Sequence, residues 1–214
     1  IVCGGGKVVE EISARLPTLT VDYCDPDLGA FGVVPDYRQG VSEAVERLLA
    51  AGHTRIVSLS GSDPKDAINP YFAREAQEGF LDAHEQAGVS PADYGPIEQA
   101  LTPEAGYRAA DKLLRLNPSK RPQAILASDG VMLGVYRAAY ELGLRIPDDL
   151  SLIGIDGIIA GAYYPPPLTT VDAHIADLGR RAVQLLLEFV DSGKARRGME
   201  LLTPTLVERA SAKI

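Results

Sequence analysis

The sequence has only two cysteines among its 214 residues, and it has no long uninterrupted apolar segment. Cys3 and Cys24 cannot build a disulfide framework, and they lack the Cys-x-x-Cys spacing of a metal or redox site, so we expect reduced thiols. No segment approaches the roughly 18 apolar residues of a membrane span, and no basic segment leads into an apolar signal core. These absences favour a cytoplasmic chain without contact to a membrane.

Basic residues are also scarce relative to acidic ones. The chain has 21 Lys and Arg against 29 Asp and Glu, which gives a formal net charge of −8. Nucleic-acid affinity rests largely on basic side chains that neutralise phosphates, so we do not expect this chain to bind DNA by itself. With 46% hydrophobic residues, the sequence is typical of a globular protein with one large or two small α/β domains.

Enzyme signatures are absent as well. The sequence contains no Gly-x-Ser-x-Gly, His-Glu-x-x-His or Gly-x-x-x-x-Gly-Lys-Ser/Thr motif, and no Gly-x-Gly-x-x-Gly follows a predicted strand. The glycine-rich segment 4–7 lacks the spacing of a phosphate-binding loop, and we interpret it as a plain loop. We expect His53 to make a structural hydrogen bond, and His84 and His174 to lie on helix surfaces. The sequence therefore predicts neither an enzyme nor a cofactor.

Short apolar segments alternate with segments of helical periodicity, a pattern that predicts βαβ units and a parallel sheet. Asp36 is placed to cap one helix and Gly52 to end it, Gly88 and Gly143 are placed to end two others, and Pro103 suits a first helical turn. The predicted strands are 1–3, 55–60, a short one around 97, 124–127, 151–155 and 205–207, and the predicted helices are 37–51, 72–87, 103–116, 131–142 and 175–190.

Polar side chains follow several of the predicted strands. In open α/β sheets, ligands bind beyond the carboxyl ends of the strands. Hydroxyl, amide and carboxylate groups there suit a hydroxyl-bearing ligand, because charge-assisted hydrogen bonds are strong and directional. The alternative is that these residues cap helices and form turns. The residues in question are Ser60, Ser62, Asp63, Gln99, Ser128, Asp129 and Asp156.

Asp156 is the strongest individual candidate, because it directly follows a strand and no helical segment behind it needs a cap. Asp129 leads straight into a predicted helix, so an N-cap and a ligand contact are equally consistent with it. Ser128, one residue earlier, is freer to face a cleft. A magnesium site formed by Asp63, Asp129 and Asp156 stays open as an alternative, although nothing in their spacing requires one.

The order and spacing of many residues resemble the effector-binding domains of the lactose-repressor and galactose-repressor (LacI/GalR) family of bacterial transcription regulators. No single segment is specific, but the series as a whole is. It comprises Asp36, Gly40, Ala44, Gly52–His53, Arg55–Ile56, Gly79–Phe80, Ala83, Gly88, Ala127, Asp129, Gly134, Gly143, Ile146–Ser151, Gly154–Asp156, Pro167–Val171, Leu178–Gly179, Ala182 and Pro204–Ser211.

The resemblance implies a periplasmic-binding-protein-like fold of type I, in which two Rossmann-like parallel-sheet subdomains are joined by three crossovers. It places the crossovers near Val34, near Val171 and around Glu200. The N-terminal subdomain would comprise residues 1–34 and 172–200, and the C-terminal subdomain residues 35–171 and 201–214. Because the sequence begins within a strand, we expect a fragment whose first subdomain is incomplete.

For the ligand site, the resemblance carries over Asp156 and Ser128 by position, and Leu101 matches a pocket-wall position that is often aromatic. Ala76 stands where the family usually has a ligand-binding arginine, and Arg74 lies two residues earlier. The family's usual Asn-Asp pair is Ser128–Asp129. Gly157 follows the site aspartate where Asp or Asn is frequent. The candidate ligand-binding residues are Asp156, Ser128, Asp129, Leu101, Arg74, Ser60 and Asp63.

The function implied is that of an effector-sensing and dimerisation domain in a transcriptional repressor. A sugar, nucleoside or similar small polar effector would bind in the cleft between the subdomains and allosterically change the spacing of the DNA-binding headpieces in a homodimer. Operator DNA would be contacted only through a headpiece outside this sequence. The main alternative is an exported periplasmic-type sugar-binding protein of a transport system. An enzyme acting on a sugar or nucleotide is the third.

Overall fold

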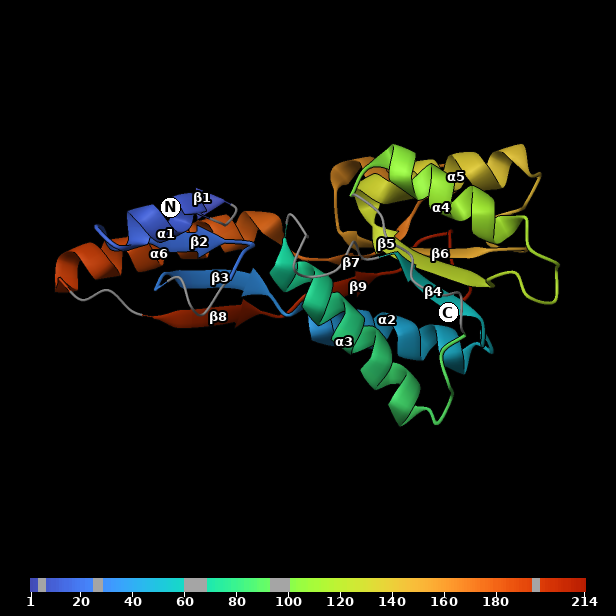
Figure 1. The fold of residues 1–214 in the computed structure, drawn as a ribbon, viewed down its shortest axis with the longest axis horizontal. Helices are drawn as coiled ribbons and strands as arrows, with labels where there is room; N and C mark the ends of the chain where they lie inside the picture. The colour runs from blue at the N-terminus through green and yellow to red at the C-terminus, as the bar shows by residue number, and fades with distance from the viewer. Residues whose placement is uncertain (4–6, 25–28, 60–68, 93–100, 194–196) are drawn as a thin grey trace.

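The structure is a computed structural model that describes residues 1–214 except 4–6, 25–28, 60–68, 93–100 and 194–196. Its described part contains two β-sheets that lie side by side, each with helices packed on it (Figure 1). All strand pairs but one are parallel, which confirms the predicted α/β fold with two Rossmann-like sheets. No described helix is long and apolar enough to cross a membrane.

The first sheet has the order β1-β2-β3-β8 and is entirely parallel. Its strands are β1 (Val2–Cys3), β2 (Leu19–Val21), β3 (Phe31–Pro35) and β8 (Gly198–Leu202), with helices α1 (Lys7–Ser13) and α6 (Ile175–Ser192). The apolar face of α6 packs on β2 and β3 through Leu178, Ala182, Leu185 and Phe189. The rings of Phe189 and Phe31 meet edge to face, with their centroids 5.9 Å apart.

The second sheet has the order β4-β5-β6-β7-β9. Its strands are β4 (Ile56–Leu59), β5 (Ala124–Ser128), β6 (Ser151–Asp156), β7 (Thr169–Asp172) and β9 (Thr205–Val207). The first four are parallel, whereas β9 runs antiparallel to β7. Successive side chains of β5 and β6 enter different cores, so both faces of this sheet are buried.

Four helices cover the two faces of the second sheet (Figure 1). On one face lie α2 (Tyr37–Ala50) and α3 (Pro70–Gln86), and on the other lie α4 (Pro103–Leu114) and α5 (Asp129–Glu141). A 3₁₀ helix, η2 (Ile159–Tyr163), follows β6. The sheet's carboxyl ends point toward the first sheet, which fixes where a site shared by the two sheets can form.

The longer predicted elements are confirmed to within a few residues. Asp36 caps α2, because its carboxylate accepts a hydrogen bond of 2.9 Å from the backbone N–H of Gln39. Pro103 occupies the first turn of α4, and β9 has the predicted bounds. Elements α1, β2, β3, β7 and β8 were not among the predicted ones, and all have seven residues or fewer. The strand expected around Ile97 and the loop at 4–6 lie outside the described residues.

One of the three predictions for histidines, that for His84, is wrong. His53 makes the expected structural contact, with Nε2 3.0 Å from the backbone oxygen of Lys213. His84 is almost fully buried, and its Nδ1 lies 2.8 Å from the backbone oxygen of Phe80. His174 lies at the N-cap of α6, half-buried, with Nε2 3.0 Å from the hydroxyl of Thr205. Helical periodicity did not reveal that β9 would lie beside His174.

The described chain passes between the two sheets three times. The first passage joins β3 to α2, the second joins β7 to α6, and the third joins β8 to β9. Two of them touch, because the backbone N–H of Asp36 donates to the carbonyl of Leu202 at 2.9 Å. The resemblance implied three such crossovers, near Val34, near Val171 and around Glu200.

Candidate functional site

The carboxyl end of β6 carries an unusual backbone conformation at Asp156. Its φ is +117°, a region that L-residues other than glycine rarely adopt, and such strain clusters at functional sites. Gly157 follows with φ +76°, and a Cβ there would lie 2.5 Å from Oδ1 of Asp172. A side chain at 157 would therefore be strained by the backbone conformation and would collide with Asp172.

The hydroxyl groups of Ser128 and Tyr37 lie near the Asp156 carboxyl. Burial raises the pKa of Asp156 well above the ordinary value for aspartate, and the nearby carboxylates of Asp129 and Asp22 raise it further. The two hydroxyl groups lower this pKa without cancelling the shift. A desolvated carboxyl with a strongly perturbed pKa at a strand end is a candidate for ligand binding.

Asp22 and Tyr37 belong to the same group of side chains, although the sequence analysis did not select them. Asp22 directly follows β2 of the first sheet, with φ +59°. The hydroxyl of Tyr37, at the start of α2, donates to Oδ1 of Asp22 at 2.7 Å. The side-chain amide of Asn69 donates to the backbone oxygen of Asp22 at 2.7 Å. An aspartate placed directly after a strand was the available signal, but β2 had not been recognised.

Asp129 is fully buried, and its carboxylate is held by protein donors. Oδ1 accepts from the hydroxyl of Thr170 and Oδ2 from the backbone N–H of Ile158, each at 2.8 Å. Burial raises the pKa of this carboxyl to about 6. The N-cap position of α5 belongs to Ser128 and not to Asp129, and the Ser128 side chain makes no capping hydrogen bond. Its hydroxyl lies near the Asp156 carboxyl and lowers the pKa of that group.

The other candidates lie apart from this group or outside the described residues. Leu101 is partly buried and packs against both cores of the second sheet. Arg74 is half-exposed on α3, with Nε 3.0 Å from Glu75 Oε1 and its guanidinium 5.9 Å from the centre of the Tyr71 ring. Ala76 is fully buried in the core beneath α3. Ser60 and Asp63, like Ser62 and Gln99, lie outside the described residues.

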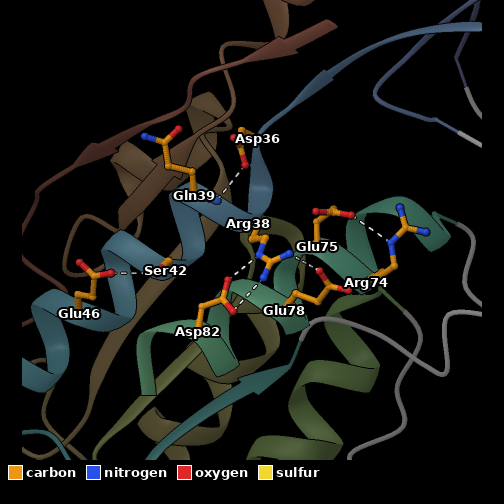
Figure 2. A network of polar contacts seen from close by, with 9 residues as sticks. All are labelled: Asp36, Arg38, Gln39, Ser42, Glu46, Arg74, Glu75, Glu78 and Asp82. Carbon is orange, nitrogen blue, oxygen red and sulfur yellow. Dashed lines mark hydrogen bonds and ion pairs between the residues drawn. The ribbon is translucent and has the colours of Figure 1, made fainter. Parts of the chain in front are cut away.

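A surface hollow of about 470 Å³ lies between α2 and α3. Figure 2 shows its polar network, in which Arg38 reaches from α2 to Glu78 and Asp82 on α3 at 2.7 and 2.5 Å. Arg74 and Glu75 form a separate pair farther along α3. Exposed ion pairs of this kind contribute about 0–1 kcal/mol, so we interpret this network as a contact between helices. The hollow is lined by Asp36, Arg38, Gln39, Ser42, Glu43, Glu46, Asp82 and Gln86.

The described residues contain no cluster of three or more His, Cys, Asp or Glu side chains placed to hold a metal ion. The magnesium site considered from the sequence included Asp63, which lies outside those residues. What the described site offers a ligand is a set of hydrogen-bonding groups from both sheets. These groups suit a molecule that donates hydrogen bonds to carboxylates.

Two α/β sheets between which the described chain passes three times agree with a periplasmic binding protein-like domain. That family matches residues 45–212 of this chain. The HTH-type transcriptional repressor PurR of Haemophilus influenzae is 37% identical over 174 residues, which cover 79% of this chain and 50% of the relative. The chain belongs to the LacI/GalR family of transcriptional regulators and corresponds to its effector-binding domain.

Solved structures agree with this assignment. A LacI family transcriptional regulator from Enterococcus faecium with bound ribose has a TM-score of 0.78 and 25% identity, covering 92% of this chain and 70% of that one. The lac repressor dimer bound to operator and an anti-inducer has a TM-score of 0.77 and 28% identity, covering 92% and 66%. The chain spans about half the length of the curated relative that it matches.

Proposed function

We propose that this chain is the effector-sensing and dimerisation domain of a cytoplasmic repressor, which binds a small polar ligand such as a sugar or nucleoside and catalyses no reaction. The observation that carries the proposal is that Asp22, from the first sheet, is hydrogen-bonded to Tyr37 and lies close enough to Asp156, from the second sheet, to raise its pKa. A ligand bound there touches both sheets, so its binding energy can favour one relative arrangement of them. The relatives named above are regulators, and one of them holds ribose.

The two sheets support the proposed division into subdomains, with residues 1–34 and 172–200 in the first and 35–171 and 201–214 in the second. Strands β1, β2, β3 and β8 fall in the first of these parts, and β4 to β7 with β9 in the second, apart from one or two residues at each crossing. Operator DNA would be contacted through a headpiece outside this sequence, as expected for a domain of net charge −8.

Within the proposed site, Asp156 and Ser128 contact the ligand and Leu101 contributes an apolar wall. Asp129 keeps a supporting role, because Thr170 and Ile158 already occupy both of its carboxylate oxygens. Arg74 contributes to ligand binding only if its side chain leaves Glu75. Ser60 and Asp63 remain proposed contacts.

Asparagine in place of Asp156 tests the site. We expect Asp156→Asn to weaken binding of a cognate sugar or nucleoside by about 10- to 100-fold, because a hydrogen bond to a charged group contributes about 1.5–3 kcal/mol. Isothermal titration calorimetry with ribose and a panel of sugars and nucleosides measures the affinity. Asp111→Asn, in an exposed ion pair on α4, is the matched control and should bind like the wild type.

Two different results of this experiment would contradict the position of the site and the class of ligand, respectively. Equal affinity of the wild type and Asp156→Asn for the same ligand would place the binding site elsewhere. A wild-type protein that binds no sugar and no nucleoside would contradict the proposed class of ligand.

We further propose that a second copy of the chain covers an exposed apolar surface formed by α5 and η2. Apolar groups gathered on a surface mark interaction sites, and the lac repressor relative is a dimer. Placing a charge there, as in Ile159→Asp, should weaken dimerisation by about tenfold or more, measured by sedimentation equilibrium. The surface comprises Leu133, Tyr140, Ile158, Ile159 and Tyr163.

Leu81→Asp is the control for this surface, because Leu81 is an exposed apolar residue on α3. We expect it to leave the association constant unchanged. If Ile159→Asp associates as tightly as the wild type, the α5 and η2 surface is not the dimer interface.

A further inference from the structure

A hollow of about 450 Å³ lies where α4 ends, beside the amino ends of β4 and β5. Part of its lining is apolar and comes from Ala92, Leu113 and Leu116. The rest consists of three cations and one hydroxyl group, and none of the described residues that line it is acidic. This composition contrasts with the net charge of −8 of the whole chain. The polar lining residues are Arg55, Lys112, Ser119 and Lys120.

The hollow lies far from the proposed effector site. Arg55 directly precedes β4, and β4 and β5 are parallel, with Ile56 opposite Ala124. Ser128, which belongs to the proposed effector site, is the last residue of β5. The carboxyl ends of these strands point toward the first sheet, so the hollow lies at the end of the second sheet that points away from it (Figure 1). A ligand in the hollow therefore occupies a second site.

Arg55 is held in place by its neighbours at the start of the sheet. Its backbone N–H donates to Oε1 of Gln123 at 3.1 Å, and its carbonyl accepts from the backbone N–H of Gln123 at 2.8 Å. Its Nε donates to the carbonyl of Arg121 at 2.8 Å, which fixes one edge of the guanidinium. Among the described residues, its two terminal NH₂ groups have no partner. A guanidinium fixed in this way presents two donors that match the oxygens of a phosphate.

The cations of the hollow differ from the other cations near α4. Arg108 and Arg115 each pair with an acidic residue one helical turn earlier. The three cations of the hollow form no ion pair with any residue that the structure describes. The negative end of the α4 dipole favours Lys112 in the last turn, but it does not account for Arg55, which belongs to another element. Like charges gathered without partners repel one another, and an anion bound among them removes that repulsion.

We propose that this hollow binds a small organic molecule that carries a phosphate group. Its volume lies within the range of about 300–1,000 Å³ that is typical of small-molecule sites. A phosphate monoester carries a charge of about −1.5 to −2 near pH 7 and three acceptor oxygens, which suit three cations and the Ser119 hydroxyl better than a carboxylate does. The apolar lining contacts the organic part of the ligand. This inference does not rest on the proposed function.

Phenyl phosphate is a suitable probe, because it joins a phosphate group to an apolar ring. We expect the backbone amide signals of Leu113, Leu116 and Ser119 to move in a two-dimensional NMR titration, with a dissociation constant on the order of 1 mM. Inorganic phosphate lacks the ring and benzyl alcohol lacks the charge, so each should bind more weakly. Benzoate, with a smaller charge, should also bind more weakly.

Two double variants with the same change in net charge test the role of the hollow. Lys112→Gln combined with Lys120→Gln alters exposed residues, so the protein should fold, and phenyl phosphate should bind about tenfold or more weakly. Arg108→Gln combined with Arg137→Gln is the control, because both arginines lie in exposed ion pairs outside the hollow. The control should bind phenyl phosphate like the wild type.

Four results would overturn the inference. The first is a wild-type spectrum in which phenyl phosphate moves no signals around the hollow. The second is an equal loss of affinity in the two double variants, which would indicate a general effect of net charge. The third is equal or tighter binding of benzyl alcohol or benzoate, because the site would then not select phosphate. The fourth is loss of phenyl phosphate binding in Asp156→Asn, which would place the anion at the proposed effector site.

Discussion

Alanine in place of Gly134 is expected to lower the free energy of unfolding by about 3 kcal/mol or more. Gly134 lies in α5 where that helix crosses α4, and a Cβ there would lie 1.8 Å from the backbone oxygen of Pro103 and 2.5 Å from the backbone nitrogen of Tyr107. Neither backbone atom can move without displacing its helix. The same crossing is tight at Gly106, where a Cβ would lie 2.4 Å from the Val131 oxygen.

Gly130→Ala is the matched control in the same helix, because the nearest atom to its added Cβ, the Ser128 hydroxyl oxygen, lies 3.9 Å away. Alanine is a better helix former than glycine, so this variant should be as stable as the wild type or slightly more stable. Urea unfolding followed by circular dichroism measures both. Equal midpoints for Gly134→Ala and the wild type would show that the two helices do not approach as closely as described.

Removing the Asp129 carboxylate should lower the free energy of unfolding by about 3 kcal/mol, since Asp129→Ala leaves the buried Thr170 hydroxyl and the Ile158 N–H without their acceptor. Asp129→Asn should retain most of the stability. Its amide oxygen can accept from Ile158, and its NH₂ group can donate to the Thr170 hydroxyl, which accepts in turn. Equal losses in the alanine and asparagine variants would contradict a role based on hydrogen bonding.

We also expect the stability of the protein to depend on pH through the Asp129 carboxyl. Its pKa is raised to about 6 in the folded protein, so between about 4 and 6 the folded state binds more protons than the unfolded state. Its contribution to stability is fully present below that window and is lost as the pH rises through it. Urea titrations across the window should show this loss in the wild type and a smaller loss in Asp129→Asn, with the raised pKa of Asp156 adding in the same direction.

The second sheet was more predictable than the first, for physical reasons. Its helices are 12 residues or longer, and residues next to them in the sequence mark where they begin and end. Examples are Asp36, which caps α2, and Gly52, which follows α2 with a positive φ. The strands of the first sheet have two to five residues, too few to establish a period. Missing β2 meant missing Asp22, which meets Tyr37 only through tertiary contacts.

The site was predictable only in part. Asp156 and Ser128 could be selected because they follow strands, and the structure brings them together. The partners of Asp129 come from Thr170 and Ile158, about 30 to 40 residues away in sequence, and no local pattern encodes that pairing. From the sequence, the position of Asp129 at the start of α5 is equally compatible with a helix cap, a ligand contact, or the hydrogen bonds to Thr170 and Ile158 that the structure shows.

The last strand of the second sheet, β9, is translated well after the strand β7 with which it pairs. β9 covers the edge of β7, and the Ser211 hydroxyl accepts from the backbone N–H of Thr169 and donates to the carbonyl of Leu152. More than 30 residues of the first sheet's chain are translated between β7 and β9. On the ribosome, β7 therefore emerges with an unpaired edge, and such edges favour aggregation. The second sheet therefore keeps one edge of β7 uncovered until β9 has been translated.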